Sequence, residues 1–211
     1  MNIKTFTVNG FAVNSFLLFD DTHEGVIIDP GFNEDAEFER FYRFIDENGI
    51  KPVRVLNTHC HVDHILGNKA VCEHFGIPLS IHGEDQFLLK RAPEMGKVFG
   101  FNVQASPTVE SYLNDGDMIV FGRSEIKVLH TPGHSPGSVS FYSKKEAFVI
   151  SGDLLFAGSI GRTDLPGGNY ETIISSIISK LMNMPRETAV FPGHGPSTTI
   201  GHEHDTNPFL Q

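Results

Sequence analysis

Apolar residues recur along the chain in two patterns, which indicates that strands and helices alternate. Short apolar runs such as residues 25–29 are typical of buried strands. In residues 34–48, Phe41 and Ile45 recur at helical spacing, and Gly49 favours the end of a helix. The predicted strands cover residues 11–19, 25–29, 53–56, 79–82, 118–121, 126–130, 138–142, 148–150 and 190–191, and the predicted helices cover residues 34–48, 65–75, 85–91 and 170–182.

Two segments fall outside this pattern. Residues 92–117 carry several Pro, Gly and Asn residues, which predicts a loop-rich segment. Residues 202–205, His-Glu-His-Asp, are rich in metal-ligand types but polar and near the C-terminus, which favours a solvated tail over a further metal site. Strands alternating with helices elsewhere predict one α/β domain over residues 1–211, with mixed sheets.

Composition and charge narrow the function. A chain of 211 residues can bury one sizeable core. The formal net charge of -10 would repel a polyanion, which disfavours nucleic acid as a partner. No apolar run reaches the roughly 18 residues that span a bilayer, and the N-terminus has no signal-peptide pattern. Two cysteines, Cys60 and Cys72, do not make a disulfide framework, so we expect a cytoplasmic protein with reduced thiols.

The strongest chemical signal is His59-x-His61-x-Asp63-His64, directly after the predicted strand 53–56. In an extended backbone, His59 and His61 point the same way. Asp63 and His64 come where the chain turns into a helix, so they can face a second point. Imidazole and carboxylate groups suit zinc, iron or manganese. Four ligands in six residues cannot bind one tetrahedral ion without severe strain, so the spacing predicts two adjacent ions.

Three further ligand-type residues, His134, Asp153 and His194, each follow a predicted strand and have glycine beside them. Glycine lets the backbone approach a site closely. These positions therefore predict loops that converge on one rim. We expect Cys60 to point away from the metals, into the packing. The predicted metal centre contains His59, His61, Asp63, His64, His134, Asp153 and His194.

These residues resemble the metallo-β-lactamase superfamily, over essentially the whole chain. The resemblance implies an αββα sandwich, in which two mixed sheets lie face to face with helices on the outside and metals at one edge. It implies that Asp153 bridges two ions, zinc being favoured and iron or manganese being alternatives. It further implies the ligands of each ion: His59, His61 and His134 for the first, and Asp63, His64 and His194 for the second.

Within the superfamily the chain is similar to the glyoxalase II group, the hydroxyacylglutathione hydrolases. Asp153 stands where some β-lactamases carry cysteine, and residues 158–164 are similar to those of short members. Only 17 residues follow His194, too few for the helical domain with which full-length glyoxalase II grips glutathione. We therefore expect a more open substrate site and weaker binding.

The resemblance implies hydrolysis of a small thioester such as S-lactoylglutathione by a water that the metals activate. Asp63 and Asp153 are the candidate catalytic carboxylates. Arg162 is the candidate ligand for a substrate carboxylate, since guanidinium matches a carboxylate as a fork. A surface salt bridge is the alternative interpretation of Arg162.

Other functions stay open at this point. A mononuclear iron persulfide dioxygenase would need only His59, His134 and Asp153. A metal-binding protein without turnover is a different class, which complete ligand sets disfavour. We expect β-lactams to be left intact. The sequence leaves a homodimer open.

Overall fold

The computed structural model describes residues 1–211 and contains two six-stranded sheets. The first sheet follows chain order: β1 (Asn2–Val8), β2 (Val13–Phe19), β3 (Glu24–Ile28), β4 (Lys51–Leu56), β5 (Leu79–His82) and β6 (Val109–Leu113). The second sheet has the order β14 (Thr198–Thr199), β13 (Ala189–Pro192), β10 (Phe148–Gly152), β9 (Val139–Ser143), β8 (Ser124–His130) and β7 (Met118–Phe121). A separate ribbon pairs β11 (Leu155–Phe156) with β12 (Ser159–Ile160).

Both sheets are mixed. In the first, β1 to β3 pair antiparallel, whereas β3 to β6 pair parallel. In the second, only β10 and β13 pair parallel. Parallel neighbours require a crossover connection. Helices supply these crossovers: α1 (Asp35–Glu47) between β3 and β4, α3 (Asn68–Phe75) between β4 and β5, α4 (Gln86–Val98) between β5 and β6, and α5 (Tyr170–Ser176) between β10 and β13.

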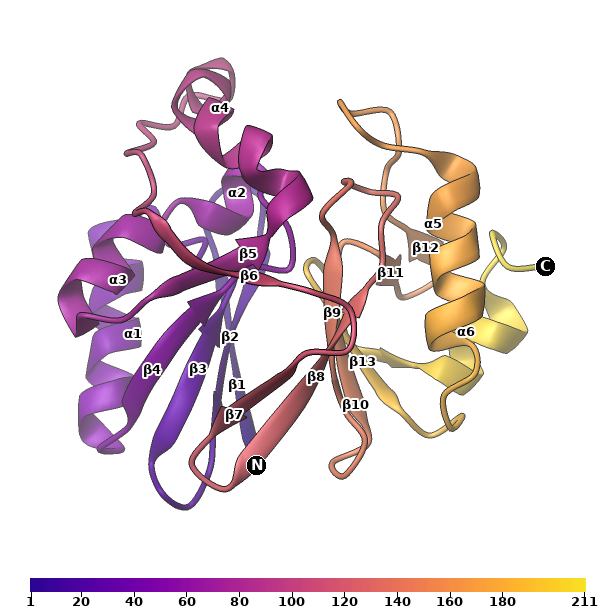
Figure 1. Cartoon of the computed structure of the whole chain (residues 1–211), viewed down its shortest axis with the longest axis horizontal. Helices are drawn as coiled ribbons and strands as arrows, with labels where there is room; N and C mark the ends of the chain where they lie inside the picture. Colours follow the sequence, from indigo (N-terminus) through magenta and orange to yellow (C-terminus); the bar gives the residue numbers. More distant parts are fainter.

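The helices cover the outer faces of the two sheets, so the molecule has four layers (Figure 1). α1 and α3 lie on the outer face of the first sheet, α4 stands above the upper edge of that sheet, and α5 and α6 (Ile200–Thr206) lie with the second. Buried apolar residues form one cluster between the sheets, around Phe16 and Phe141, and one under each helical layer, around Phe41 and Ile173. The predicted αββα sandwich is confirmed.

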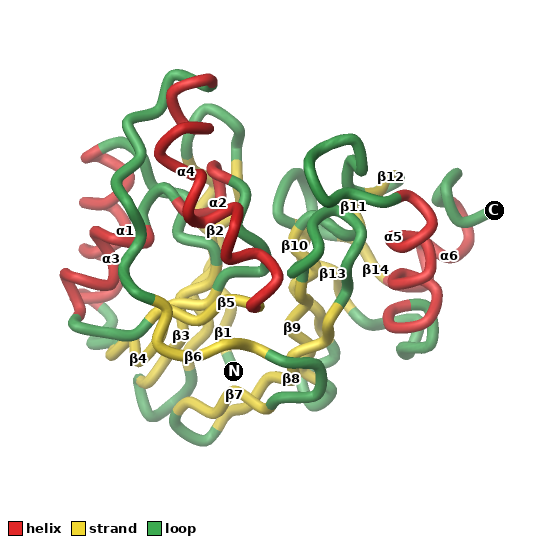
Figure 2. Tube along the Cα trace, turned by 45° about the horizontal axis from the view of Figure 1, so that its top comes forward, coloured by secondary structure: helices red, strands yellow, loops and turns green.

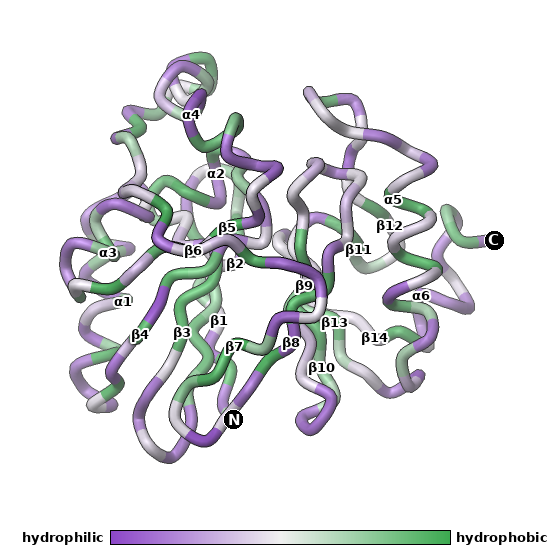
Figure 3. The backbone as a smooth tube through the Cα atoms, in the orientation of Figure 1, coloured by the Kyte–Doolittle hydropathy of each residue, from purple (hydrophilic) through white to green (hydrophobic).

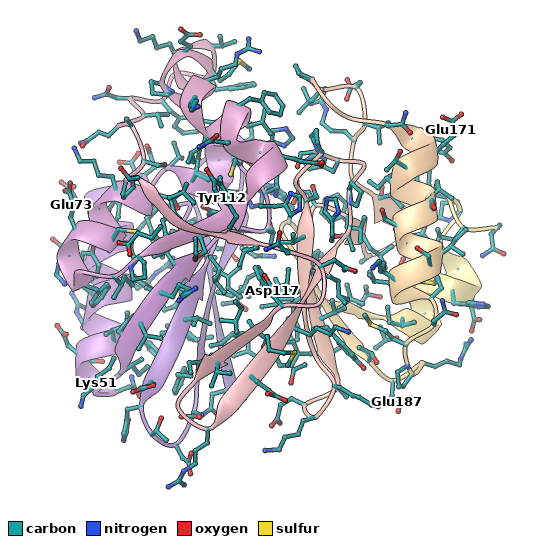
Figure 4. All side chains as sticks on the ribbon, in the orientation of Figure 1. Lys51, Glu73, Tyr112, Asp117, Glu171 and Glu187 are labelled. Atoms are coloured by element: carbon teal, nitrogen blue, oxygen red, sulfur yellow. The ribbon has the colours of Figure 1, made fainter.

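Polarity follows the same layers. Hydrophobic residues concentrate on the strands of both sheets (Figure 3). Side chains fill the space between the sheets, whereas four of the labelled charged residues, Lys51, Glu73, Glu171 and Glu187, lie toward the outside of the view (Figure 4). No helix of the structure is long and apolar enough to span a bilayer.

Every predicted strand is present, with ends that differ by a few residues. The first strand, Asn2–Val8, is missing from the prediction, because only Phe6 and Val8 are buried and the apolar alternation is incomplete. The predicted helix over residues 65–75 is divided into α2 (Val62–Ile65) and α3. The last predicted helix is α5, continued by a π-helical turn, η2 (Ile177–Leu181).

Residues 92–117 are not entirely a loop, so that prediction is wrong in part. α4 continues to Val98 and contains Pro93, although proline disfavours a helix interior. Its inner face is well packed: Leu89 and Ala92 belong to the core, and a side chain at Gly96 would collide with Val103. This packing outweighs the local preference. β6 then follows within the same segment.

The C-terminal segment is not a solvated tail. It forms α6, whose N-terminus is capped by the Thr199 hydroxyl, which accepts a hydrogen bond from the His202 N–H. Glu203 is fully buried, and its carboxylate accepts hydrogen bonds from Gly158 N–H at 2.9 Å and from Asn207 Nδ2 at 2.8 Å. A buried, hydrogen-bonded acid in a polar stretch gives no periodic signal in the sequence.

Candidate metal centre

The seven candidate ligands lie at one edge of the two sheets. Four strands end there, β4 in the first sheet and β8, β10 and β13 in the second, and the loops that follow approach one another (Figure 2). The predicted convergence of these loops is present. The residues after β4 are His59, His61, Asp63 and His64; after β8, His134; after β10, Asp153; and after β13, His194.

His59, His61 and His134 form the first group, with ring nitrogens within 4.8 Å of one another. His61 Nδ1 lies 2.8 Å from His134 Nε2. The rings of His59 and His61 have centroids 4.9 Å apart, which fits two side chains on the same side of an extended segment.

Asp63, His64 and His194 form the second group, again within 4.8 Å. His194 Nε2 lies 3.3 Å from Asp63 Oδ2 and 3.2 Å from His64 Nε2. The structure thus separates the motif of residues 59–64 into two groups, as its spacing predicts.

Asp153 lies between the two groups. Its Oδ1 is 3.4 Å from His64 Nε2, and its Oδ2 is 3.6 Å from His134 Nε2 and 3.5 Å from His194 Nε2. Gly193 permits this arrangement, since a side chain there would collide with Asp153 Oδ1 and lie 2.7 Å from His64 Cε1. Asp153 is therefore positioned to contact ions in both groups.

Neighbouring groups fix the orientation of four of these rings. Such partners hold the second ring nitrogen and direct the first toward the centre. Each partner contacts Nδ1: Thr58 Oγ1 at 3.0 Å for His59, Asp29 Oδ2 at 3.0 Å for His64, the Arg162 carbonyl at 2.8 Å for His134 and the Phe11 carbonyl at 3.0 Å for His194.

Asp29 is a functional residue that sequence analysis missed. Its carboxylate is fully buried behind His64, and it also accepts hydrogen bonds from the Thr58 N–H at 2.7 Å and the Thr58 hydroxyl at 2.5 Å. Its φ of +49° is in the left-handed region, which Asp tolerates better than most residues. The sequence pattern places Asp29 only at the end of the predicted strand 25–29. The available signal was an acid at the end of a strand that lies beside the strand leading into the metal motif.

Asp85 is a second missed residue. Its Oδ2 accepts hydrogen bonds from the Cys60 N–H at 2.9 Å and the Ser135 hydroxyl at 2.8 Å, and its Oδ1 accepts one from the Gly137 N–H at 2.7 Å. The Asp85 carboxylate thus joins the loop that carries His61 to the loop after β8 that carries His134. Burial raises the pKa of Asp85. No local signal marks it, because its partners are distant in sequence.

The electrostatics suit a cation. Burial lowers the pKa of His59 well below its ordinary value and the pKa of His61 to about 3, so both rings are neutral. Burial alone would raise the pKa values of Asp153 and Asp63, but His64 and the other histidines outweigh it, and both values lie below the ordinary one. Burial alone would lower the pKa values of His64 and His194, but Asp153 and Asp63 raise both, so the carboxylates hold positive charge at this site. The neutral rings of His59 and His61 beside ionised carboxylates match the state in which such side chains bind metal.

Several buried atoms fit bound metal better than a hydrogen-bonded cluster. His59 Nε2 and Asp153 Oδ1 have no hydrogen-bond partner. An unpaired buried polar atom costs about 1–3 kcal/mol. His64 and His194 also face one another through Nε2 atoms, which can share one proton at most. Cations ligated by these side chains would remove these costs.

A pocket of about 300 Å³ opens over the cluster. It is bounded by α4 and by the loop of residues 161–168, which stand on opposite sides of the gap at the top of Figure 1. This volume lies at the lower end of the range for small-molecule sites. Five of the candidate ligands line it, namely His61, Asp63, His134, Asp153 and His194, whereas His59 and His64 are buried beneath them.

Arg162 also lines the pocket, but its guanidinium is paired. Nε and Nη2 donate to the two carboxylate oxygens of Asp164, each at 2.7 Å. Both side chains are exposed, and the pair lowers the pKa of Asp164 to about 2. Nη1 takes no part in this pair.

Cys60 is buried in the core of the first sheet, and burial raises the pKa of its thiol. A protonated, buried thiol is a poor nucleophile. The expectation that Cys60 serves packing is confirmed.

Comparison with known proteins agrees with this geometry. Residues 8–194 match the family described as the metallo-beta-lactamase superfamily. The chain is 41% identical over 212 residues to the probable metallo-hydrolase YqgX of Bacillus subtilis. The matched region covers 100% of this chain and 98% of YqgX. It is 37% identical over 217 residues to the hydroxyacylglutathione hydrolase GloC of Haemophilus influenzae, with the same coverage.

Solved structures share the fold. The BLEG-1 B3 metallo-beta-lactamase matches with a TM-score of 0.91 and 38% identity, covering 100% of both chains. TTHA1623, solved in a di-iron-bound form, matches with a TM-score of 0.88 and 38% identity, covering 98% of this chain and 100% of that one. The matched family region contains all seven candidate ligands. On this evidence the chain belongs to the metallo-β-lactamase superfamily.

Proposed function

We propose that this protein is a two-metal hydrolase of small thioesters such as S-D-lactoylglutathione. The observation that carries the proposal is the pair of complete donor groups joined by Asp153 beneath a pocket. The relative named hydroxyacylglutathione hydrolase supports the thioester as substrate, since it matches this chain over its whole length.

The two groups divide the ligands between two ions. When bound, the ions lower the pKa of water from 15.7 to about 7 and polarise a carbonyl oxygen. Zinc suits these nitrogen and oxygen ligands, and iron or manganese are alternatives, which the di-iron form of one relative illustrates. His59, His61 and His134 would hold the first ion, Asp63, His64 and His194 the second, and Asp153 both.

The carboxylates of Asp63 and Asp153 act on the water. Both line the pocket, and both pKa values lie below the ordinary one, so both carboxylates are ionised and can orient the water by accepting hydrogen bonds from it. In the reaction, a C–O bond forms between the water oxygen and the thioester carbon, and the C–S bond breaks. The products are a carboxylate, a thiol and one proton released to solvent.

The leaving group requires little help. A thiol has a pKa of about 8.5, so it can depart as thiolate and take its proton from solvent. A dedicated general acid is therefore not needed, which agrees with a pocket floor made of ligand-type residues. Arg162 is proposed to bind a substrate carboxylate through its unpaired Nη1, on the rim of the same pocket.

The complete second group favours two ions over the alternative of a one-iron persulfide dioxygenase. That reaction needs only His59, His134 and Asp153, and it consumes oxygen. Metal content and oxygen uptake distinguish the two chemistries.

The test is to incubate metal-loaded protein without oxygen with S-D-lactoylglutathione and, separately, with benzylpenicillin. We expect thioester cleavage with release of thiol and no loss of the β-lactam. The comparison is informative because one solved relative is named a β-lactamase. Penicillin turnover without thioester cleavage, or activity that requires one iron and oxygen, would overturn the proposal. An Asp153→Ala variant gives the background rate.

A further inference from the structure

Helix α4 presents a row of apolar side chains to the pocket that the proposed chemistry does not use. Leu88, Ala92, Met95 and Phe99 all line the pocket. They are spaced by four, three and four residues, which places them on one face of the helix. We call these four residues the α4 stripe. With a rise of 1.5 Å per residue, it extends for about 16 Å.

The α4 stripe stands in a fixed position beside the candidate ligands. Leu89 and Ala92 anchor the helix in the core of the first sheet. Phe99 packs edge-on against Phe11 with ring centroids 5.6 Å apart. The Phe11 carbonyl in turn accepts the hydrogen bond from His194 Nδ1. The α4 stripe is thus held at both ends. At its Phe99 end it packs against Phe11, whose carbonyl binds the candidate metal ligand His194.

The pocket also holds an unpaired cation. Two arginines line it, Arg91 on α4 and Arg162 across the gap. Arg162 is bound by Asp164, whereas none of the ion pairs of the structure includes Arg91. In a chain with a net charge of -10, an unpaired guanidinium at the pocket is an attractive site for an anion.

We propose that α4 makes the site selective for thioesters with an extended apolar acyl chain on an anionic thiol carrier. The acyl chain would lie along the α4 stripe, and Arg91 would bind the carrier. This inference rests on the proposed thioester hydrolysis.

The chemistry of a thioester decides which part of it contacts the α4 stripe and which part contacts Arg91. Glutathione and coenzyme A, the two candidate carriers, are both polar and anionic, so only the acyl group gains from burial against apolar side chains. A lactoyl group is short and hydroxylated, and it would leave most of the stripe uncovered.

The first experiment measures kcat/KM for acetyl, butanoyl, hexanoyl and octanoyl thioesters on glutathione, coenzyme A and neutral N-acetylcysteamine. We expect kcat/KM to rise about fourfold for each methylene that becomes buried. For a given acyl group, an anionic carrier should exceed the neutral one by about tenfold. The better of the two anionic carriers identifies the source of the anion. If kcat/KM does not change with the length of the acyl chain on any carrier, the inference is overturned.

Variants locate the effect on α4. Met95→Gln should lower kcat/KM more for octanoyl than for acetyl thioesters. Val98 lies on the same helix but is 75% exposed and outside the pocket, so Val98→Gln should show the same dependence of kcat/KM on acyl chain length as the wild type. Arg91→Gln should lower kcat/KM more for thioesters on anionic carriers than for those on the neutral carrier. Lys90→Gln, at the neighbouring position outside the pocket, is the matched control. Equal losses in a variant and its control contradict the assignment.

A binding measurement separates this inference from the proposed function. S-octylglutathione and S-methylglutathione are thioethers that cannot be hydrolysed. Calorimetry on metal-loaded protein should show tighter binding of the octyl compound, and Met95→Gln should remove the difference. Equal binding of the two overturns the role of α4, whereas failure to cleave any thioester overturns only the hydrolase proposal. A wild-type dimer that Met95→Gln converts to monomers, together with equal binding, would assign the stripe to a second copy instead.

Discussion

His61 Nδ1 and His134 Nε2 face each other at 2.8 Å across the gap between the two sheets. Two imidazole nitrogens at this distance can hold one proton between them. A cation, in contrast, accepts both lone pairs, and the unpaired atoms of His59 and Asp153 lie in the same cluster. The contact is therefore better explained by a metal centre than by a hydrogen bond.

Asp153 is expected to decide the metal content. Loaded wild-type protein should carry up to two ions per chain, and Asp153→Ala should lose both, because this carboxylate contacts both groups. Elemental analysis after gel filtration measures this. Asp164→Ala, which removes an exposed acid outside the groups, should retain the ions. A loaded wild-type protein with only trace metal would refute the two-ion centre.

Asp29 should affect one ion more than the other. Asp29→Asn keeps a residue that tolerates the left-handed backbone but weakens the support of His64. Loss of such a partner typically lowers metal affinity by about 10-fold to 100-fold. Competition with a chelator should therefore show a larger loss at the site of His64, which Asp29 contacts directly, than at the site of His59, which Asp29 reaches only through the Thr58 hydroxyl. Asp35→Asn, at an exposed position of α1, is the control; equal weakening of both sites would contradict this assignment.

Arg162 is expected to act on substrate binding alone. Arg162→Ala should raise KM for S-D-lactoylglutathione by about tenfold, since it removes a charge-assisted hydrogen bond, and leave metal content unchanged. Asp164→Ala should not raise KM, because it frees the guanidinium. Steady-state kinetics measure both. An unaltered KM in Arg162→Ala removes this residue from the binding role.

Asp85 should matter for stability. Asp85→Ala leaves the Cys60 and Gly137 N–H groups without their acceptor and removes one of the two partners of the Ser135 hydroxyl, and each unpaired group costs about 1–3 kcal/mol. We expect the free energy of unfolding of the metal-free protein to fall by about 3 kcal/mol or more in urea titrations. Glu84→Ala, at the exposed neighbouring position, should change it by less than about 1 kcal/mol. Similar effects of the two substitutions would be evidence against this role.

Asp20 provides a test by pH. Burial alone would raise its pKa, but hydrogen bonds from Thr22 and the Arg123 N–H outweigh this effect and lower it. The ionised form thus contributes stability above the unfolded pKa of about 3.9, and this contribution is lost as pH falls toward the folded value. Asp20→Asn should be less stable than wild type by about 1–3 kcal/mol at pH 7 and by less at pH 3. Urea unfolding at both pH values, with exposed Asp21→Asn as control, measures this; a difference that grows in acid is the opposite result.

The metal motif could be predicted because its ligands are adjacent in sequence or stand beside glycine at the end of a strand. The spacing of these residues predicts, without knowledge of the fold, that His59 and His61 point toward one ion and that Asp63 points toward another. His134 and His194 were recognisable because strand ends of one sheet meet at one edge.

The supporting residues could not be predicted in the same way. Asp85 acts through partners 25 to 52 residues away, so only the folded chain reveals its three hydrogen bonds. The extent of α4 was missed because Pro93 disfavours a helix locally, while packing at Gly96 decides the outcome. Residue spacing reports local geometry, whereas these features depend on tertiary contacts.

The ligand pairs join parts of the chain that are far apart in sequence. His61 and His134 are separated by 73 residues, and His64 and His194 by 130. Closing such loops costs entropy, so the centre forms only once both sheets have assembled. A metal that binds only this assembled state stabilises it by mass action, much as a cross-link would. Protein depleted of metal should therefore lose its fold, and not only its activity, when a protease is present.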